Sequence, residues 1–115
     1  MCLISLFLAV FVDVSCSPPW IKFESSCHLL MNQTKDWYSA KRECFKYNAK
    51  LADCETTGKE TFLTSMLKDS DSDTIWVGSK ENNESWNDCP SLDNTNGLLL
   101  GKCYRLHNFV CEHEG

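Results

Sequence analysis

Cysteine is the residue type in this sequence with the most chemistry to offer. The chain of 115 residues contains eight cysteines, a density that is unusual in cytosolic proteins and typical of small secreted domains cross-linked by disulfides. A zinc site is the alternative, and its ligand types occur close together at Cys103, His107, Cys111 and His113. Disulfides are the better account, because an oxidising compartment favours them over free zinc-binding thiolates.

Histidine, serine and cysteine give no sign of a catalytic site. The only histidines in the sequence are His28, His107 and His113. No serine or cysteine lies in a recognisable nucleophile motif, and most thiols are expected to be committed to bridges. The sequence therefore predicts a protein that is not an enzyme.

The first 15 residues have the pattern of a cleaved signal peptide, with a buried N-terminal strand as the alternative. Residues 3–12 form a nearly all-apolar run that is too short to span a bilayer, and the small residues Ser15 and Cys16 follow it. Loss of Asp13 with this segment leaves 15 acidic against 11 basic residues, a net charge of −4. We expect a secreted, extracellular domain at residues 16–115, with no membrane insertion and no affinity for nucleic acid.

Two apolar runs, each expected to form a strand, lie next to the last three cysteines of the sequence and position them. Cys89 and Cys103 flank an Asn-Gly turn at 96–97, and residues 98–100 have the length and composition of a buried strand. A second apolar run at 109–111 ends in a cysteine. We expect a disulfide-clamped hairpin followed by a terminal strand.

The first two cysteines after the leader lie in an extended segment. Pro18 and Pro19 exclude a helix there. Cys16 and Cys27 are eleven residues apart, a spacing that suits a bridge across a small hairpin. Cleavage of the leader would then fall before Cys16.

Helical periodicity appears twice in the middle of the chain. Between residues 36 and 47, the residues of one helical face are Trp37, Ala40, Cys44 and Tyr47. A second helix is expected after a capping box at Thr57 and Glu60, with its apolar face formed by Phe62, Leu63, Met66 and Leu67. A polar run at 69–73 ends it, and residues 74–78 predict a short buried strand. The whole order indicates an α+β fold with two helices inserted in an antiparallel sheet.

This order of elements and cysteines resembles the C-type lectin-like domain in its long form. The resemblance covers the whole chain after the leader. It rests on the cysteines at both ends, on the helix around Ala40 and Cys44, on Trp76-Val77-Gly78 as the core strand, and on the Phe-Val-Cys-Glu ending at Glu112.

The resemblance implies how six of the cysteines pair. It joins Cys44 to Cys111 and Cys89 to Cys103, besides Cys16 to Cys27, whereas the sequence alone permits 15 pairings. Cys54 is left over, at a position where the family usually has an aliphatic residue. We expect a buried free thiol there rather than an interchain bridge.

Calcium binding in this family depends on oxygen-bearing side chains, and this chain departs from that pattern. Few residues separate Gly78 from Cys89, so most of the family's long loop is missing. Leu98, Leu99 and Leu100 stand where the family has a Trp-Asn-Asp triplet, and they offer no side-chain oxygen. The candidate ligand-binding residues are Glu81, Asn82, Asn87 and Asp88. We expect these four to form a solvated loop rather than a useful calcium site, so that no cofactor is required.

Two sequons fit N-glycosylation, at Asn32 and Asn83. A glycan on Asn83 would place a bulky group on the loop that receives sugar in the family.

The preferred hypothesis is a secreted C-type lectin-like recognition module that binds an extracellular protein or carbohydrate without the usual calcium site. The alternative is a calcium-dependent, carbohydrate-binding lectin with a rearranged site. A third possibility is a truncated family member that is mainly a stapled scaffold. The resemblance leaves the ligand, the oligomeric state and the role of Cys54 open.

Overall fold

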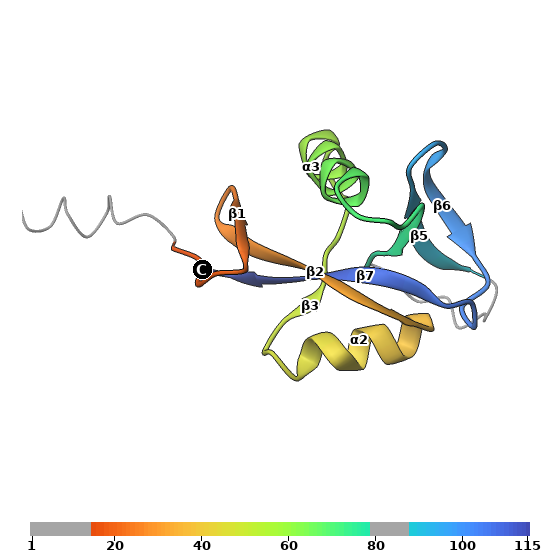
Figure 1. The fold of residues 1–115 in the computed structure, drawn as a ribbon, viewed down its shortest axis with the longest axis horizontal. Helices are drawn as coiled ribbons and strands as arrows, with labels where there is room; N and C mark the ends of the chain where they lie inside the picture. The colour runs from red at the N-terminus through yellow and green to blue at the C-terminus, as the bar shows by residue number, and fades with distance from the viewer. Residues whose placement is uncertain (1–14, 79–87) are drawn as a thin grey trace, which may run out of the picture.

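The structure, a computed structural model, describes residues 15–78 and 88–115. Its helices and strands are shown in Figure 1 and comprise β1 (Ile21–Phe23), β2 (Ser26–Lys35), α2 (Trp37–Phe45), β3 (Lys50–Leu51), α3 (Thr57–Lys68), β4 (Thr74–Trp76), β5 (Cys89–Asp93), β6 (Gly97–Gly101) and β7 (His107–Glu114). All of the predicted leader except Ser15 lies outside the described residues. In these two ranges, no helix combines the length and apolarity needed to cross a membrane.

The described strands form one sheet with β7 at its centre. The strand order is β1-β2-β7-β4-β5-β6, and β3 also pairs with β7. All neighbours are antiparallel except β4 and β7, which run parallel. The predicted α+β fold is confirmed, and the single parallel pair makes its sheet mixed.

Helices α2 and α3 lie on opposite faces of the sheet, and each covers its own apolar core (Figure 1). The strands serve both cores because successive side chains of a strand point to opposite faces. On the α2 side, Trp76 and Phe109 pack with the helix; on the α3 side, Ile75 and Val110 do so. The chain between β1 and β7 therefore builds a three-layer unit.

Two buried tryptophans fix the end of β2 and the start of α2 against β4. The indole Nε1 of Trp37 donates to the carbonyl oxygen of Val77 at 2.8 Å. The Nε1 of Trp76 donates to the carbonyl oxygen of Lys35, also at 2.8 Å. Both polar groups are thus paired inside the core, where an unpaired donor would cost free energy of folding.

Three disulfides occur in the structure, and they are the pairs that the resemblance implies. Cys44–Cys111 ties α2 to β7 across a sequence separation of 67 residues, and the chain-entropy model assigns such a bridge about 4 kcal/mol of stability. Cys89–Cys103 closes the β5–β6 hairpin, and Cys16–Cys27 holds the N-terminal segment to β2.

Both helices differ from the prediction by a residue or two at one end. The side chain of Thr56 caps α3 by accepting from the amide of Lys59 at 3.1 Å, so the predicted box beginning at Thr57 is wrong by one position. Helix α2 ends at Phe45, so Tyr47 falls outside it and is 46% exposed instead of facing the core. Asn48 adopts the predicted left-handed conformation, with φ of 56°.

Gly78 should tolerate no side chain. A β-carbon there would lie 2.7 Å from the carbonyl oxygen of Leu51, and the backbone atoms of β3 cannot turn aside as a side chain can. We expect Gly78→Ala to lower the free energy of unfolding by about 1–3 kcal/mol, a fall in melting temperature of several degrees. Thermal unfolding followed by circular dichroism measures this.

Gly58→Ala is the matched control, because its β-carbon would meet only the Phe23 ring at 3.8 Å and alanine favours helix. It should melt at the wild-type temperature or above. Equal melting temperatures for the two variants would contradict the close approach of β3 to Gly78.

Candidate ligand-binding face

The residues predicted to bind a ligand lie mostly outside the described ranges. Glu81, Asn82 and Asn87 belong to residues 79–87, as does the sequon at Asn83. Asp88 is half-buried directly before β5. Near Asp88, the structure therefore describes the sheet that supports this predicted loop, and not the loop itself.

The other sequon, at Asn32, is exposed on β2. Its Oδ1 accepts a hydrogen bond from Nδ2 of Asn108 at 3.2 Å. That contact uses the amide oxygen, whereas a glycan is attached through the amide nitrogen.

The leucine triplet of β6 forms a strand, but it is not buried as predicted. Leu98, Leu99 and Leu100 are 49%, 42% and 67% exposed. The physical reason is position in the sheet: β6 is the terminal strand in the order, and α3 lies over the strands nearer the centre. Composition alone cannot distinguish a central apolar strand from an apolar strand at an edge.

These leucines line an apolar groove of about 420 Å³. The other described residues in its wall come from the loop before α3, the two residues directly after β4 and the start of β5: Cys54, Glu55, Val77, Gly78 and Pro90. Glu55 is the only charged side chain among them. Such a wall suits apolar groups of a ligand better than sugar hydroxyls, which need several polar partners.

A smaller groove of about 150 Å³, which we call the charged groove, adjoins the apolar groove at Glu55 and Gly78. Lys41 and Lys50 contribute positive charge to it. Lys50 Nζ lies 3.4 Å from Asp53 Oδ2, and Lys41 Nζ lies 5.5 Å from the centre of the Trp37 ring. The two grooves together present apolar and charged contacts side by side.

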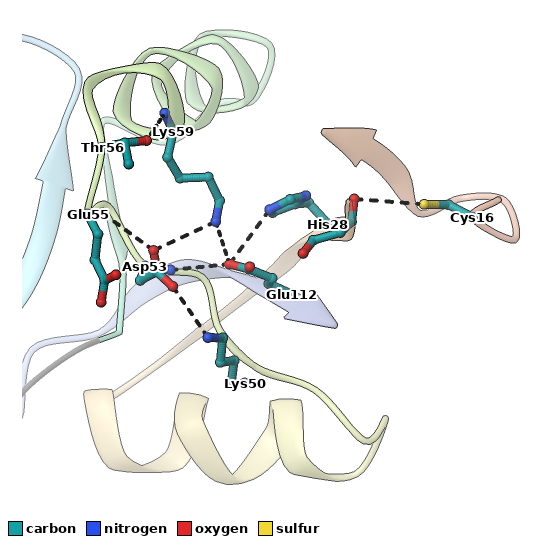
Figure 2. A network of polar contacts seen from close by, with 9 residues as sticks. Cys16, His28, Lys50, Asp53, Glu55, Thr56, Lys59 and Glu112 are labelled. Atoms are coloured by element: carbon teal, nitrogen blue, oxygen red, sulfur yellow. Dashed lines mark hydrogen bonds and ion pairs between the residues drawn. The ribbon is translucent and has the colours of Figure 1, made fainter. Parts of the chain in front are cut away.

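A buried ionic network holds the loop that separates the grooves (Figure 2). Lys59 Nζ, from the first turn of α3, lies 2.7 Å from Glu112 Oε1 of β7 and 3.8 Å from Asp53 Oδ1. The backbone amide of Asp53 donates to Glu112 Oε1 at 3.4 Å. Because Asp53 directly precedes Cys54 and Glu55, this network positions the groove wall.

The carboxyl group of Glu112 is buried, at 6% exposure, and its pKa lies well below the usual range. Burial alone would raise its pKa, but His28 and Lys59 together lower the pKa to about 2. The nearest His28 contact to Glu112, at 3.7 Å from Nε2, is longer than a hydrogen bond. Among the described residues, neither ring nitrogen of His28 has a hydrogen-bond partner. The His28 ring instead lies edge-on to the Phe62 ring at 4.9 Å between centroids.

Cys54 is the free cysteine among the described residues, and it is half-buried rather than fully buried as predicted. Burial, with the charges of Glu60 and Asp53, raises the pKa of its thiol to about 12. The thiol is therefore protonated at neutral pH and acts as an apolar part of the groove wall.

The alternative zinc site is not assembled. Cys103 and Cys111 are both in disulfides, and the described ranges contain no group of three or more histidine, cysteine or acidic side chains that could hold a metal ion.

Sequence reasoning missed Lys59 and Glu112, because lysine on a helix and glutamate near a chain end are usually exposed. A signal was present in the spacing. Lys59, Leu63 and Met66 are four and three residues apart, so the lysine lies on the buried stripe of α3.

Comparison with known proteins gives one consistent result. Residues 33–88 match the family model for the lectin C-type domain. A snaclec VP12 polypeptide of Daboia palaestinae is 27% identical over 108 residues, which cover 86% of this chain and 100% of that protein. C-type lectin domain family 7 member A of Bos taurus is 24% identical over 102 residues, or 87% of this chain, but the match spans only 39% of the bovine protein.

The fold agrees with a solved structure, rhodocetin in complex with the integrin alpha2-A domain with strontium. The TM-score is 0.74 at 19% identity, over 88% of this chain and 100% of that chain. The arrangement of two helices, sheet and disulfides is therefore the C-type lectin-like fold.

Removing the charge of Glu112 should destabilise the domain at neutral pH and much less in acid. Glu112→Gln removes the nearer of the two carboxylates that face the buried Lys59 and leaves only Asp53 at 3.8 Å, and breaking a buried ion pair typically costs about 3–5 kcal/mol. The folded pKa of about 2 lies below the ordinary value, so the wild-type carboxylate stabilises the fold at neutral pH and loses this effect as pH falls from about 4.5 towards 2. Urea unfolding at pH 7 and at pH 2.5 should show the gap between variant and wild type narrowing.

Glu114→Gln, at an exposed position of the same strand, is the control and should unfold like wild type at both pH values. A Glu112→Gln deficit of equal size at pH 7 and pH 2.5 would mean that the carboxylate charge is not what stabilises the loop.

Proposed function

The chain belongs to the C-type lectin-like domain family, and we propose that it is a secreted recognition module that binds an extracellular protein through the apolar groove without calcium. The observation that carries this proposal is the exposed leucine triplet of β6, at 49%, 42% and 67%, beside a groove with a single charged wall residue. Large exposed apolar patches on soluble proteins are typical of sites that bind other proteins.

Three further points support a protein ligand. The chain covers the full length of a snaclec polypeptide, and the related rhodocetin fold occurs in a complex with the integrin alpha2-A domain. The charged groove next to the apolar one supplies the polar rim that protein interfaces usually have. Binding of this kind needs no proton transfer and no nucleophile, so we expect a binding module and not an enzyme.

Secretion is part of the same proposal. Material from the medium of a eukaryotic host should begin at or near Cys16 and lose mass when N-glycans at Asn32 and Asn83 are removed. Intact Met1 on secreted protein would contradict it.

Calcium should neither stabilise the domain nor be needed for binding. A site occupied at a hundred times its dissociation constant would add about 2.7 kcal/mol, or on the order of 10 °C in melting temperature for a domain of this size. We expect essentially no shift between EDTA and millimolar Ca²⁺ in scanning calorimetry. A shift of several degrees, lost when Glu81, Asn82 and Asp88 are changed to Ala together, would favour the calcium-dependent lectin with a rearranged site.

Introducing a charge into the apolar groove should weaken ligand binding. We would screen arrays of extracellular protein domains and of glycans in EDTA, and then compare variants on each positive spot. Leu98→Asp should weaken binding by at least about tenfold, because a buried carboxylate without a partner opposes an apolar interface.

Leu106→Asp is the matched control, since Leu106 is 62% exposed but lines neither groove. Equal losses for both variants would mean that the groove is not the contact surface. Binding to glycan spots alone, and only with calcium, would overturn the proposed function.

A further inference from the structure

Among the described residues, strand β6 ends the sheet, and no described strand pairs with its outer long edge. Its register with β5 runs from Cys89 opposite Gly101 to Asp93 opposite Gly97. Among the described strands, β6 pairs only with β5. In Figure 1 it is the outermost strand, on the side of the molecule away from the C-terminus.

The hydrogen-bond pattern shows which backbone groups face that edge. The amide of Val77 donates to the carbonyl oxygen of Pro90 at 3.1 Å, so Pro90 directs its backbone towards β4. In an antiparallel strand the direction alternates, so Ser91 directs its own groups to Leu99 on β6. The N–H and C=O groups of Leu98 and Leu100 therefore point away from β5, towards the open edge.

Within its own residues, this strand has none of the usual protection against pairing. Natural edge strands are commonly interrupted by lysine, proline or a bulge. Residues 94–101 contain no charged residue and no proline, and the three leucines between Gly97 and Gly101 are all at least 42% exposed. An unprotected apolar edge is a template for another strand.

The sequence of β6, Gly-Leu-Leu-Leu-Gly, reads the same in both directions. We propose that β6 pairs antiparallel with β6 of a second copy of this chain, about a two-fold axis at Leu99. Leu98 of one copy then exchanges a pair of backbone hydrogen bonds with Leu100 of the partner, and the axis repeats the pair. Leu99 meets Leu99 of the partner at the axis.

Charge complementarity at the ends of the strand favours a second copy. The same register sets Lys102 opposite Asn96 of the partner. Asp93 accepts from the backbone amide of Asn96 at 2.9 Å, so its carboxylate lies at that position. Lys102 of each copy thus approaches an acid of the other, and the two-fold axis produces this contact twice.

The interface between the two β6 strands is small, so we expect the dimer to be weak. Stable interfaces usually bury about 1,200–2,000 Å² in total, and one five-residue strand with three leucines provides less. The dimer is therefore concentration-dependent, with dissociation in the micromolar range or weaker. An extended segment of an unrelated protein is the competing occupant, and it would not need the two-fold register.

Pairing along the edge leaves the apolar groove open. Pro90 lies opposite Leu100 and Leu92 opposite Leu98, so these leucines point to the α3 side of the sheet, where Leu92 packs. The apolar grooves of the two copies then lie side by side on one face of a continuous sheet. Such a dimer would engage a ligand with two adjacent sites, which raises its avidity without any new contact.

Disulfide trapping tests the register. In a Cys54→Ser background, Leu99→Cys should cross-link into a dimer under mild oxidation, because the two residues at the axis form a close, non-hydrogen-bonded pair. Leu98→Cys and Leu106→Cys are the controls and should cross-link at least about tenfold more slowly. Equal rates at positions 98, 99 and 106 would overturn the proposed register.

Sedimentation equilibrium on the chain without its leader tests the pairing itself, and it needs no ligand, so it stands apart from the proposed function. The unmodified chain should shift from monomer to dimer as its concentration rises from about 1 µM to 1 mM. Leu100→Pro, which removes the outward N–H at a position where an edge strand tolerates proline, should remain a monomer. Leu100→Val should still dimerise. A monomer at every concentration, or a dimer that survives Leu100→Pro, would overturn the proposal.

Discussion

Strand β7 is bound to both helices by contacts that lie on adjacent residues. Cys111 forms the disulfide to Cys44 of α2, and Glu112 forms the buried ion pair to Lys59 of α3. Because neighbouring side chains of a strand point to opposite faces, one dipeptide fixes the layer above the sheet and the layer below it. The remaining strands pair with β7 directly or through β2 and β4. The recognition face depends on this arrangement, since Asp53 and the groove wall after it are attached to the same carboxylate.

The part of the fold that could be predicted is the part in which local pattern and burial agree. Trp37, Ala40 and Cys44 share a helical face and a core, and the predicted strand at 74–78 is buried, although β4 itself ends at Trp76. The predictions failed where position in the sheet or end geometry decides the outcome. Leu98–Leu100 have the composition of a core strand but lie at the edge, and α2 ends at Phe45, which leaves Tyr47 outside the helix and exposed to solvent.

The candidate site could be predicted only in outline. The absence of side-chain oxygens at 98–100 was visible in the sequence, and it indicated a departure from the family's calcium chemistry. The apolar groove was not visible, because it is formed by residues from four separate segments that only the fold brings together. The ionic network of Lys59, Glu112 and Asp53 was not visible either. The spacing of Lys59 shows only that it lies on the buried stripe of α3, and it does not show which acidic residues it meets. Polar groups of this kind are found by asking which charges a fold encloses.

We propose that this face recognises a protein through apolar contact, without calcium. The most direct test of this proposal is an NMR titration of the ¹⁵N-labelled domain with a protein ligand identified on the array, carried out in EDTA. We expect amide shifts to change around Cys54, Glu55, Gly78 and the β6 strand, while those of Leu106 and Glu114, which line neither groove, stay unchanged. Changes confined to residues 81–88, and seen only after calcium is added, would contradict it.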